Sequence, residues 1–172
     1  IMTPKSLLRN KLCVSNLEDF GKKNSFHRVL WDHALDPNEK GFLELKKSNE
    51  IKKVILCSGK VYFDLLESRE KLKRDDVVML RIEQLYPFPL KSLVKEIKKY
   101  AKKAKFYWCQ EEPKNMGAWF AVRDYIQWTL DYIGAKNKEI MYIGRKPAAS
   151  PATGYAMRHI AQQKEIINKV FS

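Results

Sequence analysis

Strand-like and helix-like patterns alternate without a break from Lys53 to the end of the chain. Four short apolar runs rich in branched and aromatic residues have the composition of strands covered on both faces. After each run, apolar residues recur at the spacing of an amphipathic helix. Because strands that alternate with helices pair in parallel through right-handed crossovers, this order predicts an α/β fold with a mostly parallel sheet and helices on both faces. The four runs span residues 53–57, 77–82, 105–109 and 139–144.

The N-terminal part of the chain lacks this periodicity. A short helix that opens near Thr3-Pro4 and a brief strand at residues 25–30 are indicated, and residues 36–41 have the composition of a turn. We therefore expect residues 1–50 to form an arm that packs on an α/β domain made of residues 51–172.

The chain carries a formal net charge of +13, and much of it stands on one face of the helix expected after Pro89. A solvated helix face is one reading, and a surface that binds a nucleotide, nucleic acid or an acidic protein is the other. No arginine-rich tract with interleaved aromatics is present, which argues against nucleic acid. No apolar run approaches the length of a bilayer span, so no membrane contact is expected. The lysines of this face are Lys91, Lys95, Lys98, Lys99 and Lys102.

Cysteines and histidines form no recognisable metal or redox motif. They show neither Cys-x-x-Cys spacing nor a close Cys/His pair, so we predict no metal site. Cys57 and Cys109 fall in predicted strands and are expected to be buried thiols, with a catalytic thiol as the alternative. His27, His33 and His159 share no spacing, and structural or surface roles are expected for them.

The stretch Val77–Pro89 joins a core strand to the edge of a candidate site. Arg81, Glu83 and Gln84 put polar groups at the carboxyl end of the strand, and the prolines that follow force the chain out of the sheet. In an open α/β sheet, ligands bind beyond the carboxyl ends of the strands. We therefore expect any site to include this edge.

Three further motifs each allow two readings. Ser58–Lys60 is either a plain strand-to-helix turn or a weak phosphate cradle, since it lacks the glycine frame of a P-loop. Glu111 and Glu112 point to opposite faces of a strand, which argues against an acid/base pair and favours loop fixation over catalysis. The loop Gly144–Gly154 offers cations and hydroxyls that bind an anion or merely cap a helix. We assign no catalytic and no cofactor-binding residue.

The helix that begins near Gly117 is apolar on more than one flank. One stripe of apolar residues at helical spacing is enough to cover a sheet. This helix carries a second stripe, which is aromatic. Core packing is one explanation, and burial by a partner subunit is the other. The aromatic residues assigned to such an interface are Trp119, Tyr125, Trp128 and Tyr132.

Five blocks of this sequence carry a family resemblance. The blocks are Met2–Arg9, Arg81–Pro89, Gln110–Asn115, Gly117–Trp119 and Ser150–Gly154. In this order, and over essentially the whole chain, they resemble the C-terminal region of the E1 component of the 2-oxoglutarate dehydrogenase complex. The resemblance implies a transketolase-type C-terminal domain, a three-layer α/β/α unit whose mainly parallel sheet has one antiparallel strand.

The resemblance also implies cofactors and partners for the parent enzyme. Thiamine diphosphate and Mg²⁺ serve the decarboxylation of 2-oxoglutarate in that family, and the succinyl group passes to the lipoyl arm of the dihydrolipoyl succinyltransferase, E2. The cofactors lie between the two domains that precede this one, so the resemblance implies a piece that is inactive alone and binds neither of them. It further implies a homodimer, and a location in the bacterial cytoplasm or the mitochondrial matrix.

Some members of that family bind an effector, acetyl-CoA or an adenine nucleotide such as AMP, in a basic pocket of this domain. Carried over by motif position, the candidates are Arg28, Gln84, Lys91 and Ser92, and Arg145 joins them as a cation of the loop after the last strand. Several bacterial members have arginines where this chain has Lys91-Ser92, and lysine meets a phosphate only as a point charge. A stand-alone α/β module that binds CoA or an adenine nucleotide is the alternative function.

Overall fold

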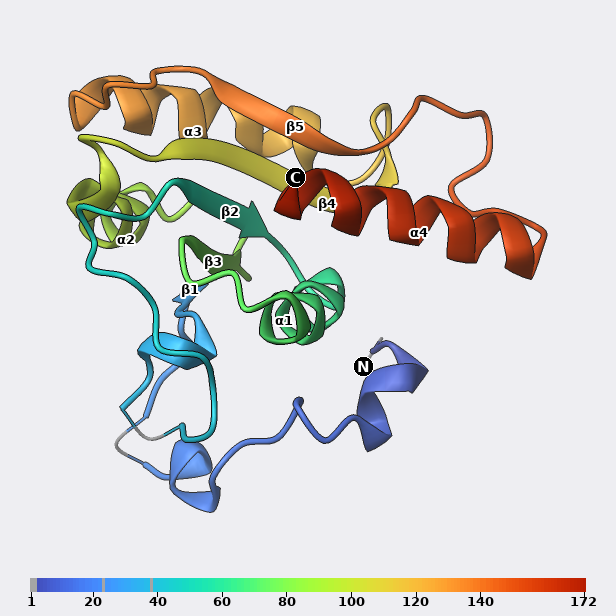
Figure 1. Cartoon of the computed structure of the whole chain (residues 1–172), viewed down its shortest axis with the longest axis horizontal. Helices are drawn as coiled ribbons and strands as arrows, with labels where there is room; N and C mark the ends of the chain where they lie inside the picture. The colour runs from blue at the N-terminus through green and yellow to red at the C-terminus, as the bar shows by residue number, and fades with distance from the viewer. Residues whose placement is uncertain (1–2, 23, 38) are drawn as a thin grey trace.

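The computed structural model describes residues 3–22, 24–37 and 39–172, so Met2 of the first block and Asn38 of the predicted turn lie outside the described residues. The described chain forms an α/β fold around one five-stranded mixed sheet with the strand order β1-β3-β2-β4-β5 (Figure 1). The strands are β1 (Val29–Leu30), β2 (Lys53–Cys57), β3 (Val77–Ile82), β4 (Lys105–Pro113) and β5 (Ile140–Arg145), and the helices are α1 (Val61–Leu72), α2 (Leu90–Ile97), α3 (Trp119–Tyr132) and α4 (Ala156–Phe171).

Four strands run parallel, and β1 alone is antiparallel to its neighbour. β1 pairs with β3, Val29 lying opposite Ile82, whereas β3, β2, β4 and β5 pair in parallel. The mostly parallel sheet with one antiparallel strand is therefore confirmed. Its carboxyl ends form one edge, as expected for strands joined by crossover helices.

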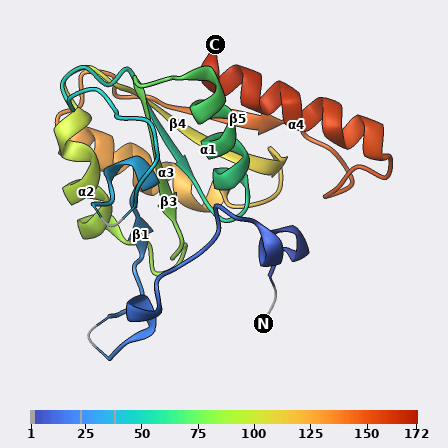
Figure 2. The same cartoon turned by 60° about the horizontal axis from the view of Figure 1, so that its bottom comes forward.

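Two hydrophobic cores cover the two faces of the sheet. Along β2, Val54 and Leu56 join the core beneath α2 and α3, while Ile55 and Cys57 join the core beneath α1 and α4. This alternation follows from the two-residue period of a strand, and it explains why β2 is apolar at every buried position. Helices on both faces, predicted from the order of elements, are confirmed (Figures 1 and 2).

Several predicted boundaries shift. The strand predicted at residues 25–30 contains only Val29 and Leu30, and the residues before them are exposed. β4 continues past Cys109 to Pro113, which pairs with Arg145 after an irregularity in register. The added residues of β4, Gln110–Pro113, are mostly polar, so a search for apolar runs does not include them in the strand.

The N-terminal segment has little regular structure of its own. It contains short 3₁₀ turns at Lys5–Arg9, Leu17–Phe20 and His33–Leu35, and among the described residues it pairs with the sheet only through β1, while the residues before β1 are mostly exposed and run away from the sheet (Figure 2). Its later part is bound to the loop after α1, where the Lys46 amide donates to the Asp75 carbonyl at 2.9 Å. In the part of the chain that the structure describes, no helix has the length and apolar character needed to cross a membrane.

Candidate functional site

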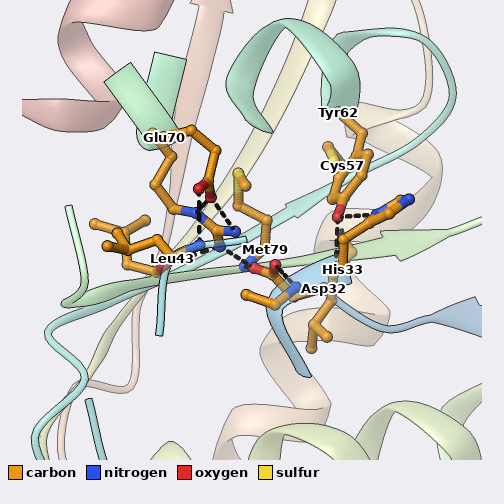
Figure 3. Close-up of polar contacts among 11 residues, drawn as sticks. Asp32, His33, Leu43, Cys57, Tyr62, Glu70 and Met79 are labelled. Atoms are coloured by element: carbon orange, nitrogen blue, oxygen red, sulfur yellow. Dashed lines mark hydrogen bonds and ion pairs between the residues drawn. The ribbon is translucent and has the colours of Figure 1, made fainter. Parts of the chain in front are cut away.

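A buried ion pair attaches the N-terminal segment to the sheet (Figure 3). Asp32 and Arg69, which lies on α1, are both fully buried and bonded to each other. The Asp32 carboxylate also accepts the backbone amides of Met79, at 2.8 Å, and Ala34, at 3.0 Å. Each charge is therefore compensated, which is the condition for leaving both of them away from water.

The sequence carried one signal for this pair that was missed. Arg69 continues the apolar spacing of Tyr62, Leu65 and Leu66 on α1, so it lies on the buried face of the helix. A cation on that face requires a buried partner. Nothing in the pattern around Asp32 identifies it as that partner, because the two residues are far apart in sequence.

His33 and Tyr62 form a second contact beside the ion pair (Figure 3). The Tyr62 hydroxyl accepts the His33 backbone amide at 2.9 Å and lies 2.6 Å from His33 Nδ1. The two groups share a hydrogen bond whose donor depends on the His33 tautomer, since the hydroxyl can donate one hydrogen and can also accept a second. Burial, and then the positive charge of Arg81, lower the pKa of His33, while burial raises that of Tyr62. His33 thus has the structural role expected for it: a half-buried ring whose lowered pKa favours the neutral form and which is hydrogen-bonded to Tyr62.

The strand-end candidates come together only in part. Arg28 donates through Nε to the Gln84 side-chain oxygen at 3.2 Å, and the Gln84 amide donates to the Pro87 carbonyl at 2.6 Å. Lys91, exposed, and Ser92, half-buried, follow in the first turn of α2. These four residues therefore belong to one corner of the sheet, at the β1–β3 side.

Glu111 does fix its surroundings. It pairs with Lys60 at 2.8 Å, and Lys60 also reaches Asp64 at 2.9 Å. Burial alone would lower the pKa of Lys60, but these two hydrogen bonds outweigh it and raise the pKa. In the turn before α1, the Gly59 amide donates to the Glu83 carboxylate at 3.3 Å, so that amide already has an anionic partner.

Gln110 organises the loop between β4 and α3. Its side-chain oxygen accepts Trp108 Nε1 at 2.9 Å and the Trp119 amide at 3.0 Å, and its nitrogen lies within hydrogen-bond distance of three loop carbonyls. Gly117, at φ +67°, passes so close that an added Cβ would lie 2.9 Å from the amide nitrogen. Only glycine fits this approach without strain. The carbonyls belong to Glu112, Pro113 and Met116.

Arg145 lies far from the other cationic candidates. It ends β5, at the opposite edge of the sheet from β1. Its Nη2 atom is 2.9 Å from His159 Nδ1, and its Nε atom is buried without a partner among the described residues. It therefore cannot share one compact pocket with Arg28.

The aromatic candidates on α3 divide into two groups. Trp119 is 7% exposed and packs against Tyr142, with 5.2 Å between ring centroids, so it belongs to the core of this chain. Tyr125, Trp128 and Tyr132 are 42%, 50% and 67% exposed. Trp128 and Tyr132 stack on each other at 5.0 Å, and Tyr125 stacks on Phe88, also at 5.0 Å. We call these three partly exposed side chains of one helix the α3 aromatic stripe (Tyr125, Trp128 and Tyr132).

The cysteines of the core strands offer no nucleophile. Cys57 and Cys109 are fully buried and unpaired, as predicted. Burial raises the pKa of both thiols, so neither is a thiolate at neutral pH. The described residues contain no group of three or more acidic, histidine or cysteine side chains arranged to hold a metal ion.

Comparison with known proteins finds a matching family and similar proteins. Residues 14–171 match the family described as 2-oxoglutarate dehydrogenase C-terminal. The chain is 52% identical over 162 residues to the 2-oxoglutarate dehydrogenase E1 components of Brucella abortus (strain S19) and Brucella anthropi, an alignment that covers 94% of this chain and 16% of each relative. Among solved structures, it is similar to a split-gene transketolase, an inactive β4 tetramer, with a TM-score of 0.48 and 13% identity over 77% of this chain and 41% of that one.

The chain thus spans 16% of the length of the curated relatives that it matches. The family match covers nearly all of its residues, and the identity is high over the same range. On this evidence, the chain belongs to the family of 2-oxoglutarate dehydrogenase E1 C-terminal domains.

Proposed function

We propose that this chain is the assembly and effector-binding part of a 2-oxoglutarate dehydrogenase E1, with residues 1–50 as an arm on the domain of residues 51–172. The whole enzyme decarboxylates 2-oxoglutarate with thiamine diphosphate and Mg²⁺ and passes the succinyl group to the lipoyl group of E2. The identity to E1 components over 94% of the chain is the observation that carries this proposal. It works in the bacterial cytoplasm or in the mitochondrial matrix.

Two acids at the carboxyl edge of the sheet already have partners within this chain and do not fit the role of holding the cofactors. At the carboxyl edge of the sheet, Glu111 is engaged by Lys60, and Glu83 accepts the Gly59 amide. Mg²⁺ prefers carboxylates that are free to coordinate it together with phosphate oxygens. Thiamine diphosphate and Mg²⁺ are therefore assigned to the rest of the enzyme, and the isolated chain is inactive as a decarboxylase.

The α3 aromatic stripe supports a role in dimer assembly. Aromatic side chains are enriched at the buried centres of protein interfaces, where they contribute most of the binding energy. The stripe faces away from both cores, since its three members are substantially exposed while Val122, Ile126 and Leu130 of the same helix are buried. A second copy of the chain is the occupant that we propose for it.

The β1–β3 corner supports an effector site for acetyl-CoA or AMP. Arg28 has guanidinium donors besides the Nε that binds Gln84, and Lys91 lies exposed in the first turn of α2. A phosphate bound between them would accept hydrogen bonds from the planar guanidinium of Arg28 and would be attracted by the ammonium group of Lys91. Arg145 lies too far along the sheet to take part.

The test of assembly uses the natural protein at its full length. We expect the double substitution Trp128→Ser/Tyr132→Ser to dissociate the dimer in sedimentation velocity and to abolish 2-oxoglutarate turnover, since each lost aromatic anchor costs about 2 kcal/mol or more of association. Leu72→Ser is the matched control, because Leu72 is 57% exposed at the end of α1, on the other face of the sheet. A double variant that remains dimeric and active would refute the assignment.

The effector role is tested separately by calorimetry with acetyl-CoA and AMP. We expect Arg28→Gln to weaken binding about tenfold or more, the value of one charge-assisted hydrogen bond, while basal turnover is unchanged. If AMP binds the isolated chain tightly and assembly with other E1 regions has no effect, the stand-alone module is the better description.

A further inference from the structure

A polar cavity lies between the end of β5 and the face of α4. Its volume is about 580 Å³, and we call it the β5–α4 cavity. That volume is in the range of small-ligand sites in proteins, roughly 300–1,000 Å³. Its walls are the end of β5, the loop after β5 and one face of α4 from its start to Lys169, and they carry four cations and one carboxylate. The charged residues are Arg145, Lys146, Arg158, Lys169 and Glu165.

The charge of the cavity is not neutralised from within. Glu165 is its only carboxylate and is engaged by Lys169 at 2.6 Å. Arg145, Lys146 and Arg158 form no ion pair with any described residue. Lys169, and to a smaller extent Lys146, lower the pKa of Glu165, but the cations still outnumber the carboxylate on one concave surface, which attracts an anion of high charge density.

Polar atoms in the wall also lack partners. Arg145 Nε, the Thr153 hydroxyl and the Gln162 side-chain oxygen are buried and make no hydrogen bond to a described residue. Buried polar atoms are nearly always hydrogen-bonded, so each such atom in a structure calls for a partner. All three belong to residues that line the same cavity.

The wall is held in place by contacts outside the cavity. The Asn115 side chain donates to the Ala148 carbonyl at 2.9 Å and accepts the Ala148 amide at 3.0 Å. The Tyr142 hydroxyl donates to the Arg145 carbonyl at 3.1 Å. His159 Nδ1 accepts from Arg145 Nη2, because a guanidinium can only donate, and this fixes the plane of the guanidinium. Arg145 is therefore positioned before any ligand arrives, which lowers the cost of binding.

We propose that the β5–α4 cavity binds a small phosphorylated ligand, whose phosphate is held by Arg145 and Arg158. Arginine forks match the geometry of phosphate oxygens. The start of α4 adds amides that no side chain caps. This site is independent of the β1–β3 corner, since β5 and β1 are the two outer strands of the sheet.

The proposal is tested on the natural protein at its full length by calorimetry and ³¹P NMR at a constant ionic strength of about 0.15 M, where interactions between distant surface charges are screened. The probes are inorganic phosphate, pyrophosphate, and citrate as a carboxylate of similar charge. We expect pyrophosphate to bind, and Arg145→Gln and Arg158→Gln each to weaken it about tenfold or more. Arg158→Gln cannot disturb folding through a lost partner, because the Arg158 side chain is exposed and unpaired among the described residues.

Arg123→Gln is the matched control, since it removes one exposed arginine from α3, away from the cavity, and should leave the affinity unchanged. Binding that Arg123→Gln weakens as much as Arg158→Gln does would be mere charge attraction and would overturn the proposal. So would an absence of binding, or citrate binding as tightly as pyrophosphate. Because Arg28→Gln tests the β1–β3 corner alone, failure of either site is recognised without the other.

Discussion

Gln110 and Gly117 depend on each other at the residue scale. The amide of Gln110 replaces backbone pairing in the loop between β4 and α3, and it can do so only because Gly117 lies against it without a side chain. The left-handed φ of Gly117 adds a second reason for glycine. Two residues seven positions apart thus specify one loop conformation.

This dependence predicts a large effect of Gly117→Ala. The left-handed conformation costs an L-residue about 1–2 kcal/mol, and the added Cβ also displaces the buried amide, so we expect a loss of about 2–4 kcal/mol in the free energy of unfolding. Gly134→Ala is the control, because Gly134 has a φ of +63° and open space around its Cβ position. Urea denaturation of both variants measures the difference, and equal losses would show that the clash with Gln110 contributes nothing.

His33 makes stability depend on pH. Its pKa is lowered in the folded protein, so the unfolded chain binds the proton more readily. The contribution of His33 to stability is therefore complete above its unfolded pKa of about 6.5 and is lost as the pH falls through the lower folded value. The groups facing it are Tyr62, Phe63, Arg81, Phe42 and the acids Asp32, Asp36 and Glu39.

We expect His33→Asn to flatten this part of the pH profile. The Asn side-chain amide can either donate to or accept from the Tyr62 hydroxyl in place of Nδ1, but it does not titrate. Thermal unfolding between pH 7.5 and 5.5 compares the two proteins, with His27→Asn as the control because His27 is exposed. A wild-type decline that His33→Asn leaves unchanged would assign the effect to other groups.

At the scale of elements, the Asp32–Arg69 pair decides whether the N-terminal segment stays attached. Removing one partner leaves the other buried without compensation, which typically costs 3–5 kcal/mol, so we expect Asp32→Ala to destabilise the protein by about that amount. Asp124→Ala is the control, since it breaks an exposed pair with Arg123 worth about 0–1 kcal/mol. Urea denaturation and limited proteolysis before residue 29 report the effect. Stability within about 1 kcal/mol of wild type would contradict it.

The strands of the sheet can be predicted from the sequence where a short apolar run is followed by apolar residues at helical spacing. β2 and β3 have the predicted bounds, because the burial that makes a strand apolar ends where its pairing ends. β1 was overestimated, because its pairing consists of only two residues added to the edge of β3. The continuation of β4 to Pro113 depends on β5, a long-range contact that local pattern does not encode.

At the scale of the whole molecule, sites depend on contacts that bring distant residues together. Gln84 is a candidate from its place after a strand and Arg28 from motif position, and the structure brings these two side chains into contact. Asp32 with Arg69, and Tyr62 with His33, were not foreseen, since no spacing relates residues on separate elements. The separation of Arg145 from Arg28 likewise follows from strand order, which a list of cations cannot give.

Five lysines on α2 and on the turn after it predict how the whole molecule responds to nucleic acid and salt. These lysines are exposed and form no ion pair with a described residue. We expect duplex DNA to bind weakly and without sequence preference, with affinity falling roughly a hundredfold between about 50 and 200 mM salt, as about four phosphate contacts require. Filter binding at several salt concentrations measures this, and sequence-dependent binding that resists salt would instead indicate a nucleic-acid site.

The reciprocal bonds between Asn115 and Ala148 have a mechanical consequence. They tie two loops that are 33 residues apart in sequence, so the rim of the β5–α4 cavity and the loop after β4 move as one body. A molecule seated in the cavity would slow amide hydrogen exchange in both loops, although it touches only one of them. Asn115→Ala would let each loop exchange at its own rate.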